Sequence, residues 1–483
     1  MSLAKQTIKE LRDQLDKKEI QPKEIIDSVI DAAEARDAKI GGYLSWDRDL
    51  AYHACEKAAE GPLSGIPIAI KDLINVKDQP CGCASKILSN YVAPYDATSI
   101  VKLREAGGIP LGRANMDEFA MGSSNENSAI KPVHNPWDLE RISGGSSGGS
   151  AAVVAADEAI AALGSDTGGS IRQPAAFCGC VGLKPSYGRV SRFGLTAYAS
   201  SLDQIGPLTK TVEDAAIVLG AISGDDTNDS TCLDEPVPNY VAELGGEIKG
   251  MKLGLPKEYF GDGIDPAIRE ATQAAAKQFE SLGAEIVEVS LPHTEQVVGV
   301  YYIIATAEAS ANLARFDGVR YGYRSPDAKD LAEQYAKSRA EGFGQEVKLR
   351  ILLGTYVLSS GYYDAYYVRA QKLRTLIRQD FTQAFEKVDA LLTPVSPTPP
   401  YKIGHKSANP MEQYLADIFT IGANLAGTCG LSLPCGTMTP SDGTKELPIG
   451  LQILGAPFAE STILKLGHHY EQSTDWHKHR PTF

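Results

Sequence analysis

Two glycine–serine clusters flank a short apolar segment between residues 142 and 185, and this stretch constrains the chain more than any other. The clusters occupy residues 144–150 and 168–170, and the segment between them is rich in alanine and valine. Glycine lets the backbone adopt positive φ angles and approach a neighbouring backbone or ligand closely. Successive N–H groups in such turns hold anions well, especially where a helix begins. The stretch therefore predicts a site that combines N–H donors with candidate serine nucleophiles.

The composition is that of an ordinary soluble globular protein, since 43% of the 483 residues are hydrophobic and 22% are charged. A net charge of −14 argues against an extensive nucleic-acid-binding face, which needs clustered Lys and Arg side chains. The N-terminal sequence lacks the apolar core of a signal peptide and carries acidic residues that are unusual in transit peptides. No run approaches the roughly 18 apolar residues of a transmembrane helix. We therefore expect no membrane contact and a cytoplasmic location, or an organelle matrix if a transit peptide has been removed.

The cysteines do not indicate a disulfide framework or a metal site. Eight cysteines in a chain of this length are too few for a disulfide-stabilised fold. Cys81 and Cys83, like Cys178 and Cys180, are separated by one residue, which is closer than zinc-binding pairs usually are. We expect buried, reduced thiols and no metal ion.

Strand-like and helix-like patterns alternate along much of the chain. Residues 65–70 form an apolar strand that ends in Lys71, residues 97–106 are helical, and residues 109–112 form a strand. Residues 252–290 predict a complete β–α–β unit. This alternation predicts an α/β fold with a central mixed, mostly parallel sheet that helices cover on both faces.

We expect one large domain over residues 1–483. Its catalytic core would span about residues 60–215. The polar, turn-rich residues 224–250 predict a surface connection, and the tyrosine-rich residues 294–385 predict a mainly helical region.

The usual chemistries of glycine-rich loops do not fit this stretch. The phosphate-binding pattern GxxxxGK[ST] is absent, as is a GxGxxG motif with an acidic residue downstream. A Ser-His-Asp triad is disfavoured because four of the eight histidines lie in the last 16 residues, without the strand–loop context that a triad base needs. Serine chemistry with a lysine base remains. A lysine at a strand end is normally a solvated charge, but Lys71 follows six residues that we expect to be interior, where burial shifts an amine toward its neutral form.

Three blocks together resemble the amidase signature family: GIPIAIKD at residues 65–72, GGSSGGSAA at 144–152 and GSDTGGSIRQPAAFCG at 164–179. Their order and spacing match that family throughout. The resemblance implies that Ser170 is the acyl-forming nucleophile, that Ser146 relays its proton, and that Lys71 is the general base. It also implies a cis peptide bond before Ser146. The backbone N–H groups that would hold the oxyanion are those of Thr167, Gly168 and Gly169.

The other serines of the first cluster have a plainer interpretation. We expect Ser143, Ser147 and Ser150 to be turn hydroxyls that form hydrogen bonds with backbone.

Residues 115–128, 183–207, 341–371 and 416–427 resemble one branch of this family, the A subunits of glutamyl-tRNA(Gln)/aspartyl-tRNA(Asn) amidotransferases. By this resemblance Arg350 would hold the α-carboxylate of glutamine, Asp417 would hold its α-ammonium group, and Tyr301 would line the pocket. A guanidinium matches a carboxylate, and a carboxylate matches an ammonium. Without the resemblance, Arg350 and Asp417 would be read as a helix-surface charge and a structural acid.

The resemblance implies a glutaminase subunit that works through an acyl-enzyme. Its ammonia would pass to a partner subunit that amidates Glu-tRNA(Gln), Asp-tRNA(Asn) or both. This chain would need no cofactor, whereas the partner would use ATP and magnesium. The assembly would be a heterotrimer with subunits B and C, and misacylated tRNA would bind through the partner. Two alternatives stay open: a stand-alone amidase of small amides with the same site, and a non-catalytic anion- or nucleotide-binding protein built on the glycine loops.

Overall fold

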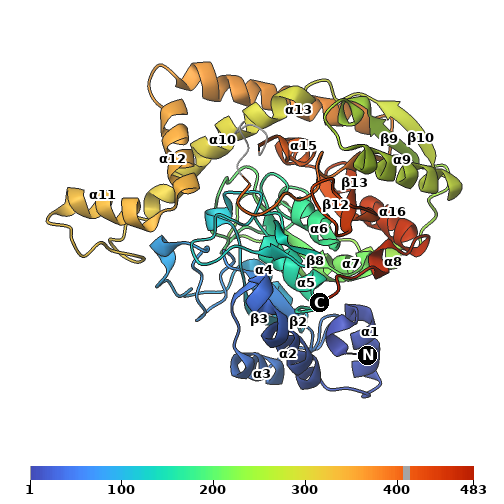
Figure 1. The fold of residues 1–483 in the computed structure, drawn as a ribbon, viewed down its shortest axis with the longest axis horizontal. Helices are drawn as coiled ribbons and strands as arrows, with labels where there is room; N and C mark the ends of the chain where they lie inside the picture. The colour runs from blue at the N-terminus through green and yellow to red at the C-terminus, as the bar shows by residue number, and fades with distance from the viewer. Residues whose placement is uncertain (1, 406–413) are drawn as a thin grey trace.

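A sheet of eleven strands runs through the computed structural model, which describes residues 2–405 and 414–483 (Figure 1). The strands of this sheet are β1 (Tyr43–Ser45), β2 (Pro67–Lys71), β3 (Ile109–Ala114), β6 (Ala161–Asp166), β7 (Val181–Lys184), β8 (Gln204–Thr209), β9 (Lys252–Pro256), β10 (Glu285–Val289), β11 (Ala390–Pro394), β12 (Cys429–Met438) and β13 (Leu447–Gly455). Their order across the sheet is β1-β3-β2-β6-β8-β7-β12-β13-β11-β9-β10. A separate pair consists of β4 (His134–Asn135) and β5 (Asp138–Ile142).

Helices flank this sheet, as the sequence predicts. They are α1 (Ile8–Asp16), α2 (Pro22–Ile40), α3 (Arg48–Glu56), α4 (Thr98–Glu105), α5 (Gly148–Ala155), α6 (Arg172–Cys178), α7 (Val212–Ile222), α8 (Tyr240–Glu243), α9 (Pro266–Ser281), α10 (Val297–Asn312), α11 (Leu331–Gly342), α12 (Gln345–Val357), α13 (Arg369–Phe385), α15 (Ile418–Ala426) and α16 (Glu460–Gln472). A π-helical turn, Tyr363–Val368, leads into α13. The α/β class is confirmed.

The sheet is mixed, but the expectation that it is mostly parallel is wrong. Parallel pairs join β2 to β3 and β6, and β9 to β10 and β11. They are outnumbered by the antiparallel pairs β1–β3, β6–β8, β7–β8, β7–β12, β12–β13 and β11–β13. One antiparallel pair, β12–β13, is a hairpin, because the short connection between the two strands cannot hold the crossover that a parallel pair needs.

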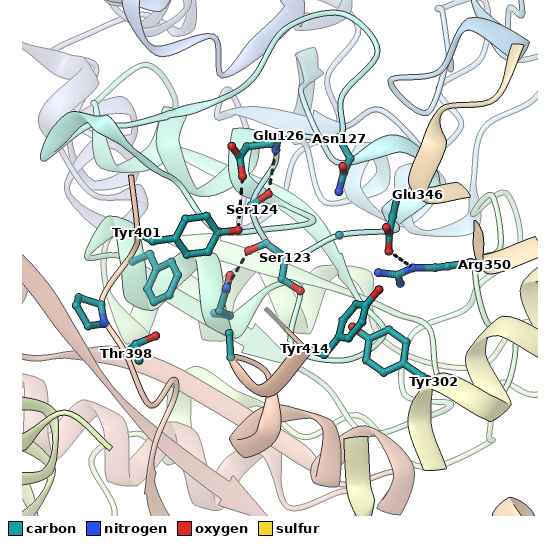
Figure 2. A pocket seen from close by; sticks show the side chains of 15 residues that line it. Ser123, Ser124, Glu126, Asn127, Tyr302, Glu346, Arg350, Thr398, Tyr401 and Tyr414 are labelled. Atoms are coloured by element: carbon teal, nitrogen blue, oxygen red, sulfur yellow. Dashed lines mark hydrogen bonds and ion pairs between the residues drawn. The ribbon is translucent and has the colours of Figure 1, made fainter. Parts of the chain in front are cut away.

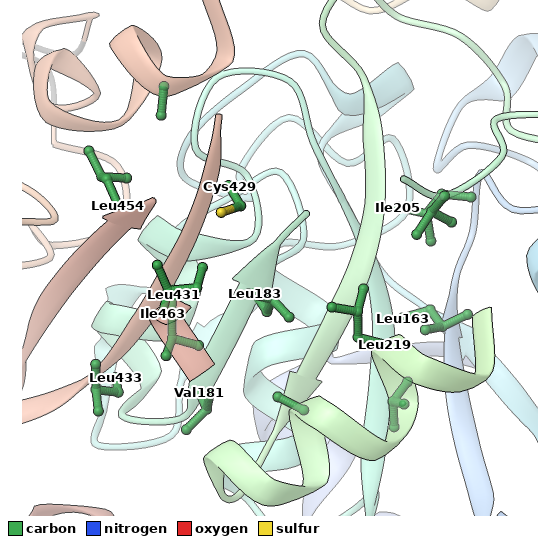
Figure 3. Packing of buried hydrophobic residues seen from close by; sticks show 14 of the residues in the cluster. Leu163, Val181, Leu183, Ile205, Leu219, Cys429, Leu431, Leu433, Leu454 and Ile463 are labelled. Carbon is green, nitrogen blue, oxygen red and sulfur yellow. The ribbon is translucent and has the colours of Figure 1, made fainter. Parts of the chain in front are cut away.

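The parallel strands β3, β2 and β6 place their carboxyl ends at one edge of the sheet. Along β2, Ile68 and Ile70 point to one face and Ala69 to the other, as the period of two in a strand requires. The alanine face packs against α5, whose small side chains let the helix lie close to the sheet. Larger side chains fill the opposite face, among them Leu163, Ile205 and Leu219 (Figure 3).

The predicted surface connection at residues 224–250 is partly structured, because it contains α8 and buries Tyr240, Leu244 and Ile248.

The region 294–385 is mainly helical, as expected. Its helical segment Thr294–Arg315 is long and apolar enough to cross a membrane by length and composition, with a mean hydropathy of 1.3. That apolarity matches its position, since 56% of the apolar window is buried inside the protein. The sequence of residues 411–426 also predicts a helix; the structure describes this range from residue 414 onward, and α15 forms its second half.

Candidate active site

Lys71 is the last residue of β2 and is completely buried. Its Nζ atom lies 2.8 Å from the Oγ atoms of Ser146 and Ser147 and 3.0 Å from that of Ser165. Burial lowers the pKa of Lys71 from 10.5 to about 7, although the negative charges of Asp117 and Asp166 act in the opposite direction. An ammonium group can donate to all three hydroxyls. After losing a proton, the amine can accept from one of them.

Ser146 lies in the loop that leads into α5, and the Gly145–Ser146 peptide bond is cis, as the family resemblance implies. The loop is held on both sides. The Gly145 N–H donates to Gln173 Oε1 at 3.0 Å, and the Asp117 N–H donates to the Ser146 carbonyl at 3.2 Å. A Cβ atom on residue 145 would collide with Asp117 Oδ2, so only glycine fits there.

Ser170 follows β6 in the turn that precedes α6 and is 8% exposed, whereas Ser146 is fully buried. Within the described residues its hydroxyl makes no hydrogen bond, so the side chain is free to turn toward a substrate. The N–H of Ser147 donates to the Ser170 carbonyl at 3.1 Å, which ties the two glycine–serine loops together. The candidate relay and the candidate nucleophile therefore belong to one connected backbone unit.

Asp166 anchors the turn that carries Ser170. Its carboxylate accepts hydrogen bonds from the N–H groups of Gly169 at 2.8 Å and Ile171 at 3.1 Å, and from the Arg172 guanidinium at 3.0 Å. Burial alone would raise the pKa of Asp166, but the charge of Arg172 holds it well below its usual range. This buried ion pair is bonded to the backbone at several points, so it fixes the turn in one conformation.

The three predicted oxyanion donors differ in their bonding. The Gly169 N–H is occupied by Asp166, whereas the N–H groups of Thr167 and Gly168 have no acceptor within the part of the chain that the structure describes. The Ser170 N–H is equally unoccupied there. Buried N–H groups without partners are rare in proteins, and here they line the turn before the candidate nucleophile.

One of the predicted substrate residues, Arg350, lines a cavity of about 690 Å³, which includes space open to solvent (Figure 2). Arg350 on α12 lines this cavity, and its guanidinium donates to Glu346 Oε1 at 2.8 Å and to the Tyr198 hydroxyl at 2.7 Å. Asp417 is not one of the lining residues, but it accepts a hydrogen bond from Ser123, which lines the cavity. Burial raises the pKa of Asp417 to about 7, against the effect of the Ser123 hydroxyl and the Arg350 charge.

Tyr301 lies closer to the catalytic turn than to the cavity. A Cβ atom on Gly168 would be 2.7 Å from the Tyr301 ring. The neighbouring Tyr302 lines the cavity instead, with its ring 5.2 Å from the Arg350 guanidinium carbon (Figure 2). Tyr301 thus covers the oxyanion turn, and Tyr302 covers Arg350.

Sequence reasoning misses three parts of this site. Ser143 and Ser150 bond to backbone as expected, but the Ser147 hydroxyl contacts both Lys71 Nζ and the Ser165 carbonyl. Ser165 and Asp117 lie inside stretches that resemble the family, at residues 164–179 and 115–128, but nothing in those stretches singles them out. A strand alignment would have found Ser165, because the parallel pairing of β2 with β6 brings the two strand ends together. Asp117 has no comparable signal, since its position depends on a loop.

Known proteins resemble this chain over nearly its whole length. Residues 24–464 match the amidase family. This chain belongs to the amidase family. It is 60% identical to the A subunit of glutamyl-tRNA(Gln) amidotransferase from Akkermansia muciniphila, over 97% of this chain and 99% of that protein. It is 55% identical to the protein of the same name from Geotalea daltonii, over 99% of both chains. The crystal structure of the corresponding protein from Thermotoga maritima superimposes with a TM-score of 0.79 at 41% identity, covering 96% of this chain and 94% of that one.

Proposed function

We propose that this amidase-family chain is the glutamine-hydrolysing subunit of a tRNA-dependent amidotransferase. The observation that carries the proposal is a fully buried amine, Lys71 Nζ, within 2.8 Å of the Ser146 hydroxyl. The amine's pKa of about 7 leaves a large neutral fraction at physiological pH. High identity over nearly the full length to proteins named as amidotransferase subunits supports the assignment to such a complex.

The Ser170 hydroxyl attacks the side-chain carbonyl carbon of glutamine, and its proton passes to Ser146 while the Ser146 proton passes to Lys71. The tetrahedral oxyanion is held by the unoccupied N–H groups of the turn before Ser170. When the C–N bond breaks, the proton returns from Lys71 through Ser146 to the leaving nitrogen, which departs as ammonia. Water then attacks the acyl ester by the same proton route and releases glutamate and free Ser170.

The cavity suits an amino acid because a cationic group, Arg350, lines it and an acidic group, Asp417, is hydrogen-bonded to its lining residue Ser123. The Arg350 guanidinium is the partner for an α-carboxylate, and Asp417 is the partner for an α-ammonium group. Binding of a cation lowers the pKa of a buried carboxyl. Substrate binding is therefore expected to keep Asp417 ionised at neutral pH.

The ammonia has to reach an acceptor, which this chain does not itself activate. We propose that a partner subunit binds misacylated tRNA and uses ATP and magnesium to activate Glu-tRNA(Gln), Asp-tRNA(Asn) or both, while this chain needs no cofactor. The assembly is a heterotrimer with subunits B and C in the cytoplasm. The net charge of −14 agrees with a complex in which the partner, rather than this chain, makes most of the contacts with tRNA.

The test is to react the protein with glutamine near neutral pH, to stop the reaction with acid, and to locate the modified residue by peptide mass spectrometry. A glutamyl adduct on Ser170 supports the proposal. A protein that shows neither adduct nor ammonia release with any amide is a binding protein instead.

A stand-alone amidase and an amidotransferase subunit differ in whether glutamine hydrolysis responds to partner subunits and charged tRNA. Ammonia release from glutamine should rise when the partner subunits and charged tRNA are added. If small amides are hydrolysed faster than glutamine and the partner has no effect, the stand-alone amidase is correct.

A further inference from the structure

A group of large apolar side chains is exposed on one side of the helical region. They are Leu349, Leu352, Leu353, Tyr356, Leu358, Tyr362, Tyr363 and Tyr366, with exposed fractions between 36% and 68%. They belong to α12, to the turn after it and to the π-helical turn Tyr363–Val368. We call this group the Leu–Tyr face. Large exposed apolar patches on soluble proteins mark interaction sites.

Helix α12 is apolar on both of its sides. Val347, Gly354 and Val357 face inward together with Arg350, while Leu349, Leu352, Leu353 and Tyr356 follow the spacing of a second helix face. A surface helix of a globular protein normally has one apolar and one polar side. The outer side of α12 is therefore built to be covered.

The Leu–Tyr face has the composition of an interface core. Between residues 349 and 366 only two side chains carry a charge, Arg350, which is buried, and Asp364, which is exposed. Three of the tyrosines form a cluster, with the Tyr356 ring 4.3 Å from that of Tyr362 and 6.2 Å from that of Tyr366. Interface cores are enriched in tyrosine and depleted in charge, whereas helices that lie on membranes carry Lys and Arg beside their apolar side. These features favour a protein partner over a lipid surface.

The face lies directly behind the substrate cavity. Arg350 and Glu346 on the inner side of α12 line the cavity, and the outer side of the same helix carries Leu349, Leu352 and Leu353. In Figure 1, α11 and α12 project from the sheet at the margin of the molecule, where a second subunit has access. A partner on this face would brace the helix that holds the α-carboxylate of the substrate.

We propose that the Leu–Tyr face is the docking surface for another subunit of the amidotransferase, one that presents an apolar, tyrosine-compatible surface with few charges. The inference rests on the proposed function, because that function requires a partner to receive ammonia. It adds the place where the partner binds. It also assigns to the partner a second role, that of holding α12 against the cavity.

The experiment compares Leu352→Glu with Ile130→Glu in the full-length chain, co-expressed with the other amidotransferase subunits of the same organism. Leu352 is 68% exposed and Ile130, outside the face, is 59% exposed, so the two variants introduce the same charge at matched sites. A charge placed in an interface core is expected to weaken assembly about 30-fold or more, as loss of a binding hot spot does. Ile130→Glu is expected to assemble like the wild type. Unfolding temperatures of both isolated variants should equal that of the wild type.

Hydrogen exchange of the wild-type complex gives a second readout. Peptides covering residues 349–366 are expected to gain protection when the partner subunits are added. Assembly of Leu352→Glu with unchanged affinity, or no added protection over 349–366, overturns the docking surface while leaving the proposed function intact.

Two further outcomes also overturn the inference. A wild-type chain that is dimeric alone and becomes monomeric through Leu352→Glu has a second copy on this face. A chain whose Leu–Tyr face binds anionic vesicles uses that face to contact a membrane. If the wild type neither assembles with the other subunits nor hydrolyses glutamine, the proposed function itself fails.

Discussion

The catalytic loops and the helical region around α12 differ in how they are held. Every residue from 141 to 186 is buried, and the polar groups of the catalytic loops are joined by hydrogen bonds to Lys71, Asp166 and Gln173. On the substrate side, Arg350 and Glu346 are carried by α12, whose outer side is exposed. The chemical step is thus preorganised by the core of this chain, whereas the substrate wall is free to depend on a partner. Substitutions in the first region should change the rate of the chemical step, and those in the second should change substrate binding.

The largest effect is expected from Ser170→Ala. Removing the nucleophile should lower kcat for glutamine hydrolysis about 10⁴-fold or more. The fold should be unaffected, because the Ser170 hydroxyl makes no hydrogen bond within the described residues. Steady-state kinetics and thermal unfolding measure the two effects. Ser150→Ala is the control, since that hydroxyl bonds only to the Leu163 carbonyl. An active Ser170→Ala enzyme would move the nucleophile elsewhere.

Lys71→Met should be the next most damaging change. Loss of a general base typically costs about 10²–10⁴-fold in rate. The methionine fills the buried site with a side chain of similar length, so the loss should appear in kcat with little change in KM. The acyl-enzyme from glutamine should form correspondingly slowly in a stopped-flow or quench measurement. Retention of most of the rate would assign the base to another residue.

Arg350→Met tests the substrate wall. A hydrogen-bonded ion pair to the substrate carboxylate is worth about 1.5–3 kcal/mol, so KM for glutamine should rise about 10–100-fold. Hydrolysis of butanamide, which lacks the α-carboxylate, should change little. An equal loss for both amides would mean that Arg350 supports the catalytic loops, and the contrast between the two regions would fail.

The pH dependence should also separate the regions. Lys71, with a pKa of about 7, must be neutral to accept a proton, so kcat should rise with pH through 7 and fall about tenfold per unit below it. Asp417, also with a pKa of about 7, must be ionised to hold the substrate, so kcat/KM of the free enzyme should rise more steeply over the same range. Asp417→Asn should remove this additional steepness. A kcat that falls with rising pH near 7 contradicts the assignment of Lys71.

The smallest effect is expected at Glu118, which links the regions. Its buried carboxylate accepts from the Gly344 N–H at 2.8 Å, at the start of α12, while the N–H of the adjacent Asp117 donates to the Ser146 carbonyl. Weakening one hydrogen bond by Glu118→Gln should raise KM for glutamine about fivefold and leave kcat and butanamide hydrolysis unchanged. Glu333→Gln, at the start of α11, is the control for loss of a carboxylate at a partly exposed helix start away from the cavity. A change in kcat alone would place Glu118 with the catalytic loops.

The sequence by itself determined the α/β class, the strand that ends in Lys71 and the two glycine–serine loops. The strands and helices follow from the spacing of apolar residues along the chain, and the loops follow from the φ angles that only glycine adopts easily. The sequence also indicated the family, since each of the three blocks is an uninterrupted run of residues that can be recognised without the structure. Tertiary structure alone decided the contacts of Ser147 and Ser165 with Lys71, the bond of Gly169 to Asp166, the antiparallel half of the sheet and the exposure of the outer side of α12. These depend on which strands pair and on which surfaces remain uncovered, and such long-range contacts are set by packing of the whole chain.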